Sequence, residues 1–342
     1  MTDLNKPCVS IIIPCYNVDK FIQNTLEAIR EQSFENYEVL LIDDGSTDLT
    51  KNICTSVCKI DSRFKYFFQR NQGPSKARNY ALSLAQGKYI CFLDSDDIIH
   101  KHYLSLMITS QICTGADIVF CDYDVGSVIN DSSFICDKVD QLMSVDSFYK
   151  YIFGLKTNKL YGANGGFLWN KLFTKDLIEG IKIPDTSIAE DEQFLFKVCK
   201  KVNGVSFLAE KLYFYKQRVG QITHNEIFRF GFPSSRLQLY AWVNTKIEKD
   251  IVVAAYAQAV VGLVISIFLG RVSPSKDQLI LTRSYVTKLI HLKRMHPAMV
   301  VLLEDKYRRY YHLIYLFLLP ISILSLLLKT NFLSAVKRVK NF

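Results

Sequence analysis

Residues 89–97 have the sequence Tyr89-Ile90-Cys91-Phe92-Leu93-Asp94-Ser95-Asp96-Asp97, in which five largely apolar residues lead directly into an acidic turn. A short apolar run of this kind is typical of a strand that is buried on both faces of a sheet. Ligands of open α/β sheets bind beyond the carboxyl ends of such strands. The stretch therefore predicts a buried strand with a polar site at its end.

Similar apolar runs lie on both sides of this stretch and alternate with segments of helical periodicity. The further runs that predict strands are residues 9–13, 39–42, 64–68 and 118–121, and the helical stretches between the first of them lie near 21–29, 53–57 and 75–84. Strands and helices that alternate at this spacing predict a mostly parallel α/β sheet covered on both faces. We expect Pro14 to end the first strand.

The composition is that of a globular protein with a large core. The chain has 342 residues, of which 49% are hydrophobic and 22% are charged, and this excludes disorder, a coiled coil and a collagen-like repeat. Nine cysteines without a Cys-x-x-Cys pair predict reduced thiols, and neither a disulfide framework nor a zinc site. No secretory segment is recognised near Met1, so we expect a cytoplasmic protein.

The charge is distributed unevenly along the chain. Residues 1–225 contain 25 Lys/Arg and 27 Asp/Glu, whereas residues 226–342 contain 17 Lys/Arg and 6 Asp/Glu. This difference predicts a nearly neutral catalytic body followed by a helical, basic and apolar C-terminal region that faces an anionic partner. The basic residues do not alternate with aromatic ones as in nucleic-acid grooves, so a membrane surface is favoured over nucleic acid.

Two apolar segments of the C-terminal region are candidates for membrane contact. Residues 251–270 contain no charge and are long enough to span a bilayer. A buried helix is favoured, because spanning would place nine Lys/Arg of residues 271–312 outside, against the positive-inside pattern. Residues 313–328 are shorter and flanked by basic residues. They predict an interfacial anchor within residues 313–342, with a core helix as the alternative.

The polar clusters at the predicted strand ends suggest a metal and a phosphate ligand. No Gly-x-Gly-x-x-Gly follows the first strand and no Gly-Lys-[Ser/Thr] is present, which argues against a dinucleotide cofactor and a P-loop. Asp94 and Asp96 offer hard oxygen ligands that can hold Mg²⁺ or Mn²⁺ and leave positions open for a diphosphate.

Five motifs in this order resemble the family 2 glycosyltransferases of GT-A (Rossmann-like) fold, which are inverting sugar transferases of bacterial polysaccharide assembly. The motifs are Val9-Ser10-Ile11-Ile12-Ile13-Pro14-Cys15-Tyr16-Asn17, Asp43-Asp44-Gly45-Ser46-Thr47-Asp48, Asn71-x-Gly73-x-Ser75-x-Ala77-Arg78-Asn79, Gly87-Lys88-Tyr89-Ile90 and Asp94-Ser95-Asp96-Asp97. The resemblance continues more loosely through Trp169–Phe173 and Glu190-Asp191-Glu192 to Tyr213–Arg218. It implies a glycosyltransferase domain over residues 6–225, with a nucleotide-sugar half at 6–125 and an acceptor half at 126–225, before the helical region 226–342.

The resemblance also implies the roles of individual residues in donor binding. Tyr16 is expected to pack on a uracil ring, with core packing as the alternative, and one carboxylate of Asp43 and Asp44 to accept the uracil N3–H. The metal is expected on Asp96 and Asp94, with His224 as a third ligand. The residues expected to bind the nucleotide-sugar are Pro14, Tyr16, Asn17, Asp43, Asp44, Asn71, Arg78, Asp94, Ser95 and Asp96.

Inverting transfer also needs a base that deprotonates the acceptor hydroxyl. In the family this base is the Asp of a Glu-Asp pair at a helix start, which implies Asp191, with Glu190 beside it on the acceptor side. Asp97 is expected either to orient the turn or to approach the donor sugar on the acceptor side, and Trp169 either to stack on an acceptor sugar or to fill the core. The loop 162–166 is expected to contact the acceptor, and Tyr215, Arg218 and His224 to close the site over the diphosphate.

These residues favour a metal-dependent transferase that moves a sugar, most simply from a UDP-sugar, to a glycan or polyprenyl-diphosphate-linked acceptor at the inner face of the membrane. Two alternatives stay open at this point. A nucleotidyltransferase is disfavoured because residues 14–24 contain no Gly-rich triphosphate loop. A non-catalytic membrane-associated scaffold of the same fold is disfavoured because Asp96 and Asp191 are both present.

Overall fold

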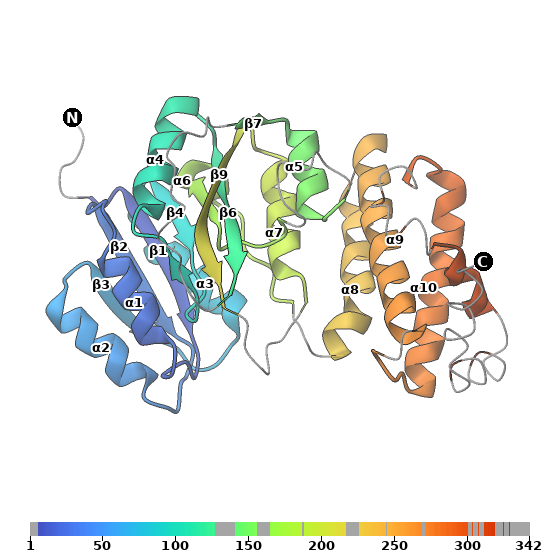
Figure 1. Cartoon of the computed structure of the whole chain (residues 1–342), viewed down its shortest axis with the longest axis horizontal. Helices are drawn as coiled ribbons and strands as arrows, with labels where there is room; N and C mark the ends of the chain where they lie inside the picture. The colour runs from blue at the N-terminus through green and yellow to red at the C-terminus, as the bar shows by residue number, and fades with distance from the viewer. Residues whose placement is uncertain are drawn as a thin grey trace. The chain divides into compact units, whose positions relative to one another are not determined.

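The computed structural model describes residues 6–126, 141–155, 165–186, 188–216, 226–243, 245–268, 271–299, 303, 307, 311–318, 324 and 328. The chain forms two compact units (Figure 1). The first comprises Met1–Ile152 and Thr157–Val219, and the second comprises Phe153–Lys156 and Gly220–Phe342. The predicted boundary at residue 225 falls outside the described residues.

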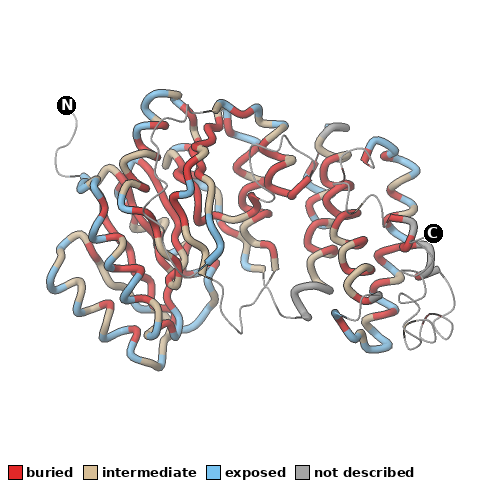
Figure 2. Tube along the Cα trace, in the orientation of Figure 1, coloured by how far each residue is buried: buried red, intermediate tan, exposed pale blue. Residues whose placement is uncertain are grey.

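The first unit is built on one sheet in the strand order β3-β2-β1-β4-β8-β6-β9-β5, with β7 paired to β9. The strands are β1 (Val9–Cys15), β2 (Tyr37–Asp43), β3 (Phe64–Phe68), β4 (Tyr89–Phe92), β5 (Ile98–Ile99), β6 (Ile118–Val125), β7 (Gln141–Met143), β8 (Lys171–Thr174) and β9 (Val205–Tyr215). Their central side chains form the core of the unit, as the buried strands in Figure 2 show.

The parallel arrangement expected from the sequence holds for one half of the sheet. β3, β2, β1 and β4 are mutually parallel. Beyond β4 the expectation is wrong, because the short strand β8 pairs antiparallel with both β4 and β6. β6 is parallel to β9 instead. The sheet is therefore mixed, and the site predicted from parallel strand ends belongs to the half that contains β1, β2 and β4.

Pro14 lies inside the first strand and does not end it, because β1 continues to Cys15. The Leu93 amide donates to the Ile12 carbonyl, so the polar backbone groups of even-numbered residues in β1 face β4. The pairing between β1 and β4 ends at Ile12 and Phe92. The missing N–H of Pro14 therefore costs no hydrogen bond of the sheet.

Helices follow most strands of the first unit. They are α1 (Ile22–Arg30), α2 (Thr50–Ile60), α3 (Pro74–Leu84), α4 (Tyr103–Thr114), α5 (Val145–Ile152), α6 (Lys175–Ile178) and α7 (Glu190–Cys199). The apolar stripe expected on the first helix is buried, with Ile22, Leu26 and Ile29 facing the core. α3 begins with Pro74 directly after Gly73, whose φ of 90° places it in the left-handed region. These two residues fix the turn that starts α3.

The described part of the second unit is helical. Its elements are α8 (Glu226–Leu239), η4 (Tyr240–Trp242), α9 (Lys246–Phe268), α10 (Lys276–Met295) and η5 (Tyr311–Leu318). α9 contains a 20-residue segment, Glu248–Ile267, that is long and apolar enough to cross a membrane, and most of this segment is buried inside the protein (Figure 2). This burial agrees with the buried helix favoured by the sequence.

Most of the predicted anchor at residues 313–342 lies outside the described residues. Of those whose burial is described, Leu313, Ile314, Phe317 and Leu324 are buried and Leu328 is half-buried, and η5 packs against α9 and α10. For these residues the core-helix alternative fits, whereas the interfacial anchor does not, because an anchor must present its apolar side chains to lipid.

Candidate active site

The ends of β1, β2 and β4 lie side by side at one edge of the sheet. Parallel register places Cys15 opposite Asp43, and Ile12 opposite Phe92. The three polar clusters that follow these strands therefore meet, as the sequence predicted. α3 adds Arg78 to this edge, and the start of α7 adds the Glu190–Asp191 pair, because both side chains approach Arg78.

A single guanidinium joins the acidic turn after β4 to the Glu-Asp pair of α7. The Arg78 Nη2 atom donates to Asp94 Oδ1 at 2.9 Å, and its Nη1 atom lies 3.7 Å from Asp191 Oδ1 and 3.9 Å from Glu190 Oε1. The Arg78 side chain is 8% exposed. Residues that are distant in sequence, and that the resemblance assigned to donor and acceptor, thus belong to one charged cluster.

Some buried polar atoms of this cluster make no hydrogen bond. Within the described residues, Arg78 Nε, Arg78 Nη1 and Asp191 Oδ1 are buried and have no hydrogen-bond partner. Buried polar groups are normally satisfied, so such atoms call for a functional explanation. The guanidinium N–H groups are suited to bind anionic oxygens of a substrate, and the carboxylate oxygen is suited to accept a hydrogen bond from a substrate hydroxyl.

Asp191 has the ionisation expected of a base that works near neutral pH. Burial raises its pKa to about 7, although the Arg78 charge acts in the opposite direction. Its carboxylate accepts a hydrogen bond from the Leu168 amide at 3.3 Å, and 19% of the side chain is exposed. Ala189, which precedes the pair, has a φ of 57°. Strain of this kind in a residue other than glycine is found at functional sites.

The acidic turn after β4 alternates between exposed and buried side chains. Asp94 and Asp96 are partly exposed, whereas Ser95 and Asp97 are buried. The two accessible carboxylates are those predicted to hold the metal. Ser95 accepts a hydrogen bond at its backbone carbonyl from Thr25 Oγ1, which fixes the turn to α1.

Asp97 supports the turn and does not face an acceptor. Its carboxylate accepts hydrogen bonds from the Tyr213 hydroxyl at 2.6 Å and from the Lys216 amide at 2.9 Å, and its side chain is buried. Burial raises its pKa to about 8, with the Asp94 charge as the next cause. Of the two roles expected for Asp97, orientation of the turn fits the structure, and the assignment to the acceptor is wrong because the side chain is enclosed.

The Asp43–Asp44 pair is buried and anchors the loop that precedes α3. Asp43 accepts hydrogen bonds from the Ser46 amide and the Tyr66 hydroxyl. Asp44 accepts from Gln69 and from the amides of Gln72 and Gly73. The Thr50 amide at the start of α2 donates to Asp48 and to neither of these two carboxylates.

Tyr16 and Asn17 follow β1 at the same edge. The Tyr16 side chain is 49% exposed, which excludes the alternative of core packing and leaves its ring accessible. Asn17 links the end of β1 to the loop after β2. Its backbone N–H donates to Ser46 Oγ, and its side-chain oxygen accepts from the Thr47 backbone N–H. Asn71 is exposed and lies close to Gly45. A Cβ atom added at Gly45 would lie only 2.9 Å from the backbone nitrogen of Asn71.

Trp169 belongs to the core. It is 4% exposed, and Tyr213 stacks on it with a centroid distance of 4.3 Å. Phe167 and Tyr215 also lie nearly parallel to the indole ring. No surface is left for an acceptor sugar, so that interpretation is wrong and core packing applies.

Other expectations fall on residues without a description. Arg218, His224 and residues 162–164 of the predicted acceptor loop lie outside the described residues. Within the described part of the chain, no group of three or more His, Cys, Asp or Glu side chains is arranged to hold a metal. The accessible pair Asp94 and Asp96 nevertheless fits Mg²⁺ or Mn²⁺, because such ions are usually held by one or two carboxylates together with substrate phosphates.

Two residues of the site escaped the sequence analysis. Lys171 is fully buried at the start of β8, and Tyr213 links Asp97 to the Asp94 amide. A lysine directly before the apolar pair Leu172-Phe173 was the available signal for the first. Both residues lie in segments of the looser resemblance, Trp169–Phe173 and Tyr213–Arg218, but the role of Tyr213 was not predictable because its partner lies 116 residues away.

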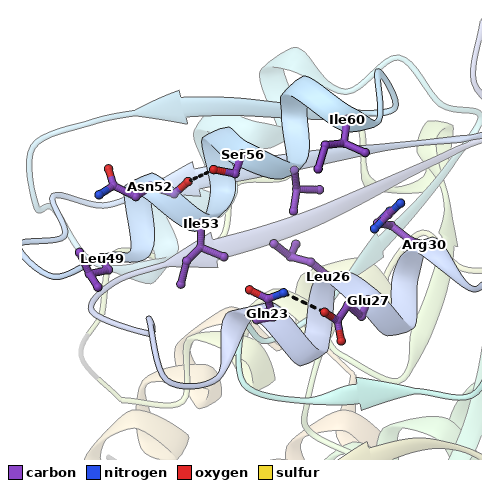
Figure 3. Close-up of a pocket in the computed structure, with 10 residues that line it drawn as sticks. Gln23, Leu26, Glu27, Arg30, Leu49, Asn52, Ile53, Ser56 and Ile60 are labelled. Carbon is purple, nitrogen blue, oxygen red and sulfur yellow. Dashed lines mark hydrogen bonds between the residues drawn. The ribbon is translucent and has the colours of Figure 1, made fainter.

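A separate groove lies between α1 and α2 (Figure 3). Its volume is about 340 Å³, and Leu26, Ile53, Val57 and Ile60 provide much of its apolar lining. Its lining includes none of the residues predicted for donor, metal or acceptor. The groove is therefore not part of the candidate active site.

Known sequences resemble this chain over much of its length. The family model for glycosyl transferase family 2 matches residues 10–176. EpsH of Bacillus subtilis is 31% identical over 229 residues, which cover 64% of this chain and 63% of EpsH. The glycosyltransferase GlyA of Streptococcus pneumoniae is 28% identical over 283 residues, which cover 79% of this chain and 39% of GlyA. The chain thus spans less than two thirds of the length of either relative.

Solved structures share the fold over most of the chain. TarS 1-349 of S. aureus in complex with UDP-GlcNAc aligns with a TM-score of 0.68 at 22% identity, covering 90% of this chain and 87% of TarS. The mannosyltransferase PcManGT from Pyrobaculum calidifontis in complex with GDP-Man and Mn²⁺ aligns with a TM-score of 0.54 at 16% identity, covering 92% and 86%. The α/β fold expected from the resemblance is confirmed. Over residues 10–176 the chain is thus similar in sequence to glycosyl transferase family 2, and its fold agrees with that match.

Proposed function

We propose that the chain transfers a sugar from a UDP-sugar, with inversion, to a hydroxyl of a glycan or polyprenyl-diphosphate-linked acceptor in bacterial exopolysaccharide, capsule or O-antigen synthesis. The observation that carries this proposal is the Arg78 cluster. It brings Asp94, from the turn that would hold donor and metal, and Asp191, the expected base, to one guanidinium. A carboxylate whose pKa is raised to about 7 beside that turn favours a catalyst over a binding scaffold.

In the proposed reaction the acceptor oxygen forms a bond to the anomeric carbon, while the bond from this carbon to the diphosphate oxygen breaks. The acceptor proton passes to Asp191, and the nucleoside diphosphate leaves with the bonding electron pair. A base with a pKa near the working pH is suited to this step. The Arg78 N–H groups that make no hydrogen bond would bind the diphosphate or the sugar.

Asp94 and Asp96 would hold Mg²⁺ or Mn²⁺, which supplies positive charge at the departing diphosphate when bound. The choice of metal draws support from PcManGT, which was solved with Mn²⁺. The choice of uracil draws support from TarS, which was solved with UDP-GlcNAc and with UDP. Tyr16, exposed at the end of β1, provides the ring on which the base would stack.

A thermal-shift panel tests the donor assignment. UDP, GDP, CDP and ADP and their sugar conjugates are each added with and without Mn²⁺, and Tm is measured. We expect the largest stabilisation from UDP or a UDP-sugar, and only with metal, because at a fixed concentration a ligand that binds the folded state more tightly raises Tm more. A preference for another base would overturn the uracil assignment. No response to any nucleotide from a folded sample would overturn the proposal as a whole.

We also propose that the protein associates peripherally with the inner face of the cell membrane. The support comes from α10, whose side chains Lys276, Lys288 and Arg294 are exposed together with Ile280 and Met295. A basic helix face that also carries exposed apolar side chains matches an anionic lipid surface.

Co-sedimentation with vesicles tests the membrane assignment. We expect binding to vesicles that contain anionic phosphatidylglycerol, weak binding to neutral phosphatidylcholine, and release at high salt, because exposed charges are screened. The double variant Lys288→Glu/Arg294→Glu should lose binding and keep its Tm. Equal binding of this variant and the wild type would contradict the role of α10.

A further inference from the structure

Lys171 is a buried charged residue that the proposed reaction does not use. It is fully buried at the start of β8. Its Nζ atom donates to the Phe167 carbonyl at 2.6 Å and to Asn170 Oδ1 at 2.7 Å. The rings of Phe120 and Tyr151 lie 5.9 Å from this nitrogen. A lysine in such apolar surroundings costs folding free energy, so its retention calls for an explanation.

The Phe167 carbonyl and the Leu168 amide belong to the same peptide group. The carbonyl accepts from Lys171, and the amide donates to Asp191 Oδ2 at 3.3 Å. One peptide group therefore links the lysine to the expected base. Donation to a carbonyl polarises the peptide and strengthens the hydrogen bond from its N–H.

The lysine itself is held in place from two sides. Asn170, which accepts one of its hydrogen bonds, donates to the Cys121 carbonyl at 2.7 Å. The Cys121 amide in turn donates to the Asn170 carbonyl at 3.1 Å. The ammonium group is thus fixed between β6 and the segment that precedes β8, and this geometry leaves the Phe167 carbonyl as its second partner.

We propose that Lys171 is a positioning residue that holds the Phe167–Leu168 peptide with its N–H directed at Asp191 and thereby keeps this carboxylate in place and in its charged form. This inference rests on the proposed function, in which Asp191 is the base. Lys171 acts through the peptide and does not touch the substrate.

The ionisable surroundings agree with this role. Burial lowers the pKa of Lys171 to about 7, whereas the charge of Asp191, followed by Cys121 and Cys199, favours the protonated lysine. The charged groups that act on Asp191 are Arg78, which favours its ionised form, and Glu190 and Asp94, which oppose it. Because the interaction between two opposite charges is mutual, the protonated Lys171 favours the ionised form of Asp191 as Asp191 favours the protonated lysine.

The test compares the pH profile of kcat/KM for UDP release between the wild type and Lys171→Met. Loss of the lysine removes a positive charge and the anchor of the peptide, so the acidic limb should move to higher pH by about one unit. At pH 6.5 the rate should fall about tenfold, whereas at pH 9, where the carboxylate is ionised anyway, it should lie within about threefold of the wild type. Lys171→Arg should restore the acidic limb.

The matched control is Lys175→Met, which removes another lysine that donates to a backbone carbonyl, that of Ala85, and should leave the profile unchanged. Lys171→Gln serves as a second neutral variant if Lys171→Met does not fold. A parallel loss at every pH, an unchanged profile, or loss of UDP stabilisation in both neutral variants would overturn the inference. A wild type that releases no UDP from any sugar nucleotide would instead overturn the proposed function.

Discussion

Replacement of Arg78 by methionine removes the charge that joins the acidic turn to the Glu-Asp pair and keeps most of the apolar side chain. In the wild type the guanidinium lies 2.9 Å from Asp94, 3.7 Å from Asp191 and 3.9 Å from Glu190. We therefore expect Arg78→Met to lower the free energy of unfolding, because carboxylates remain without their counter-charge in a largely buried site.

The size of the loss follows from burial. Removing one partner of a fully buried ion pair costs about 3–5 kcal/mol. Asp94 and Glu190 are 31% and 22% exposed, so water compensates part of the charge and the lower end applies, about 3 kcal/mol. For a domain of this size the corresponding fall in Tm is about 6–12 °C.

The loss should depend on pH. Arg78 lowers the pKa of Asp191 in the folded protein, which nevertheless lies at about 7 because of burial. A partner that lowers the pKa of a carboxyl group stabilises the fold above that pKa and ceases to do so as the pH falls through it. The part of the loss that comes from Asp191 should therefore be present at pH 8 and absent at pH 5.5.

Differential scanning fluorimetry at these two pH values measures the effect. The control is Lys76→Met on the same helix, which breaks an exposed pair with Asp185 at 3.2 Å and should cost less than about 1 kcal/mol at either pH. If Arg78→Met lowers Tm no more than Lys76→Met, or lowers it equally at both pH values, the reasoning about the Arg78 cluster is refuted.

Four further substitutions test separate parts of the site. Trp169→Ala should cost about 3–5 kcal/mol of stability in chemical denaturation, as expected of a core indole; an unchanged stability with lost acceptor affinity would restore the acceptor role. Tyr16→Ala should weaken UDP binding about tenfold in calorimetry through lost stacking and leave Tm unchanged; an unaltered affinity would remove Tyr16 from the donor site. Asp96→Asn should abolish the metal dependence of UDP binding, and a retained dependence would exclude Asp96 as a ligand. Because burial raises the pKa of Asp191 in the folded protein, the contribution of this carboxyl group to stability is fully present below about pH 4 and is lost as the pH rises through 7. Asp191→Asn should therefore raise Tm more at pH 8 than at pH 5.5. An equal change at both pH values would contradict the burial argument.

The sequence predicted those features that depend on local patterns. Apolar runs such as 39–42 identified the strands, because a strand buried on both faces has little freedom in composition. Polar residues at the strand ends, from Asp43 to Asp97, identified the site edge because parallel strands bring their carboxyl ends together. The assignment of Asp191 came from a resemblance, and the spatial cluster with Arg78 agrees with it.

Features that depend on contacts between distant segments were not predictable in this way. The antiparallel insertion of β8 between β4 and β6 has no local signature, because the composition of a four-residue strand does not indicate whether it pairs parallel or antiparallel with its neighbours. The burial of Trp169 depends on Tyr213 and Tyr215, which lie more than forty residues away in sequence. The contact between Lys171 and the Phe167 carbonyl is local in sequence, but its link to Asp191 is not.

The measurement that tests the central claim most directly is sugar transfer by Asp191→Asn beside the wild type, with UDP binding measured on the same samples. Loss of a general base lowers kcat by about 10²–10⁴-fold, and we expect a loss in this range together with UDP affinity close to that of the wild type. The wild-type product should carry the sugar in the inverted anomeric configuration. Transfer by Asp191→Asn at a rate near that of the wild type would contradict the assignment of Asp191 as the base.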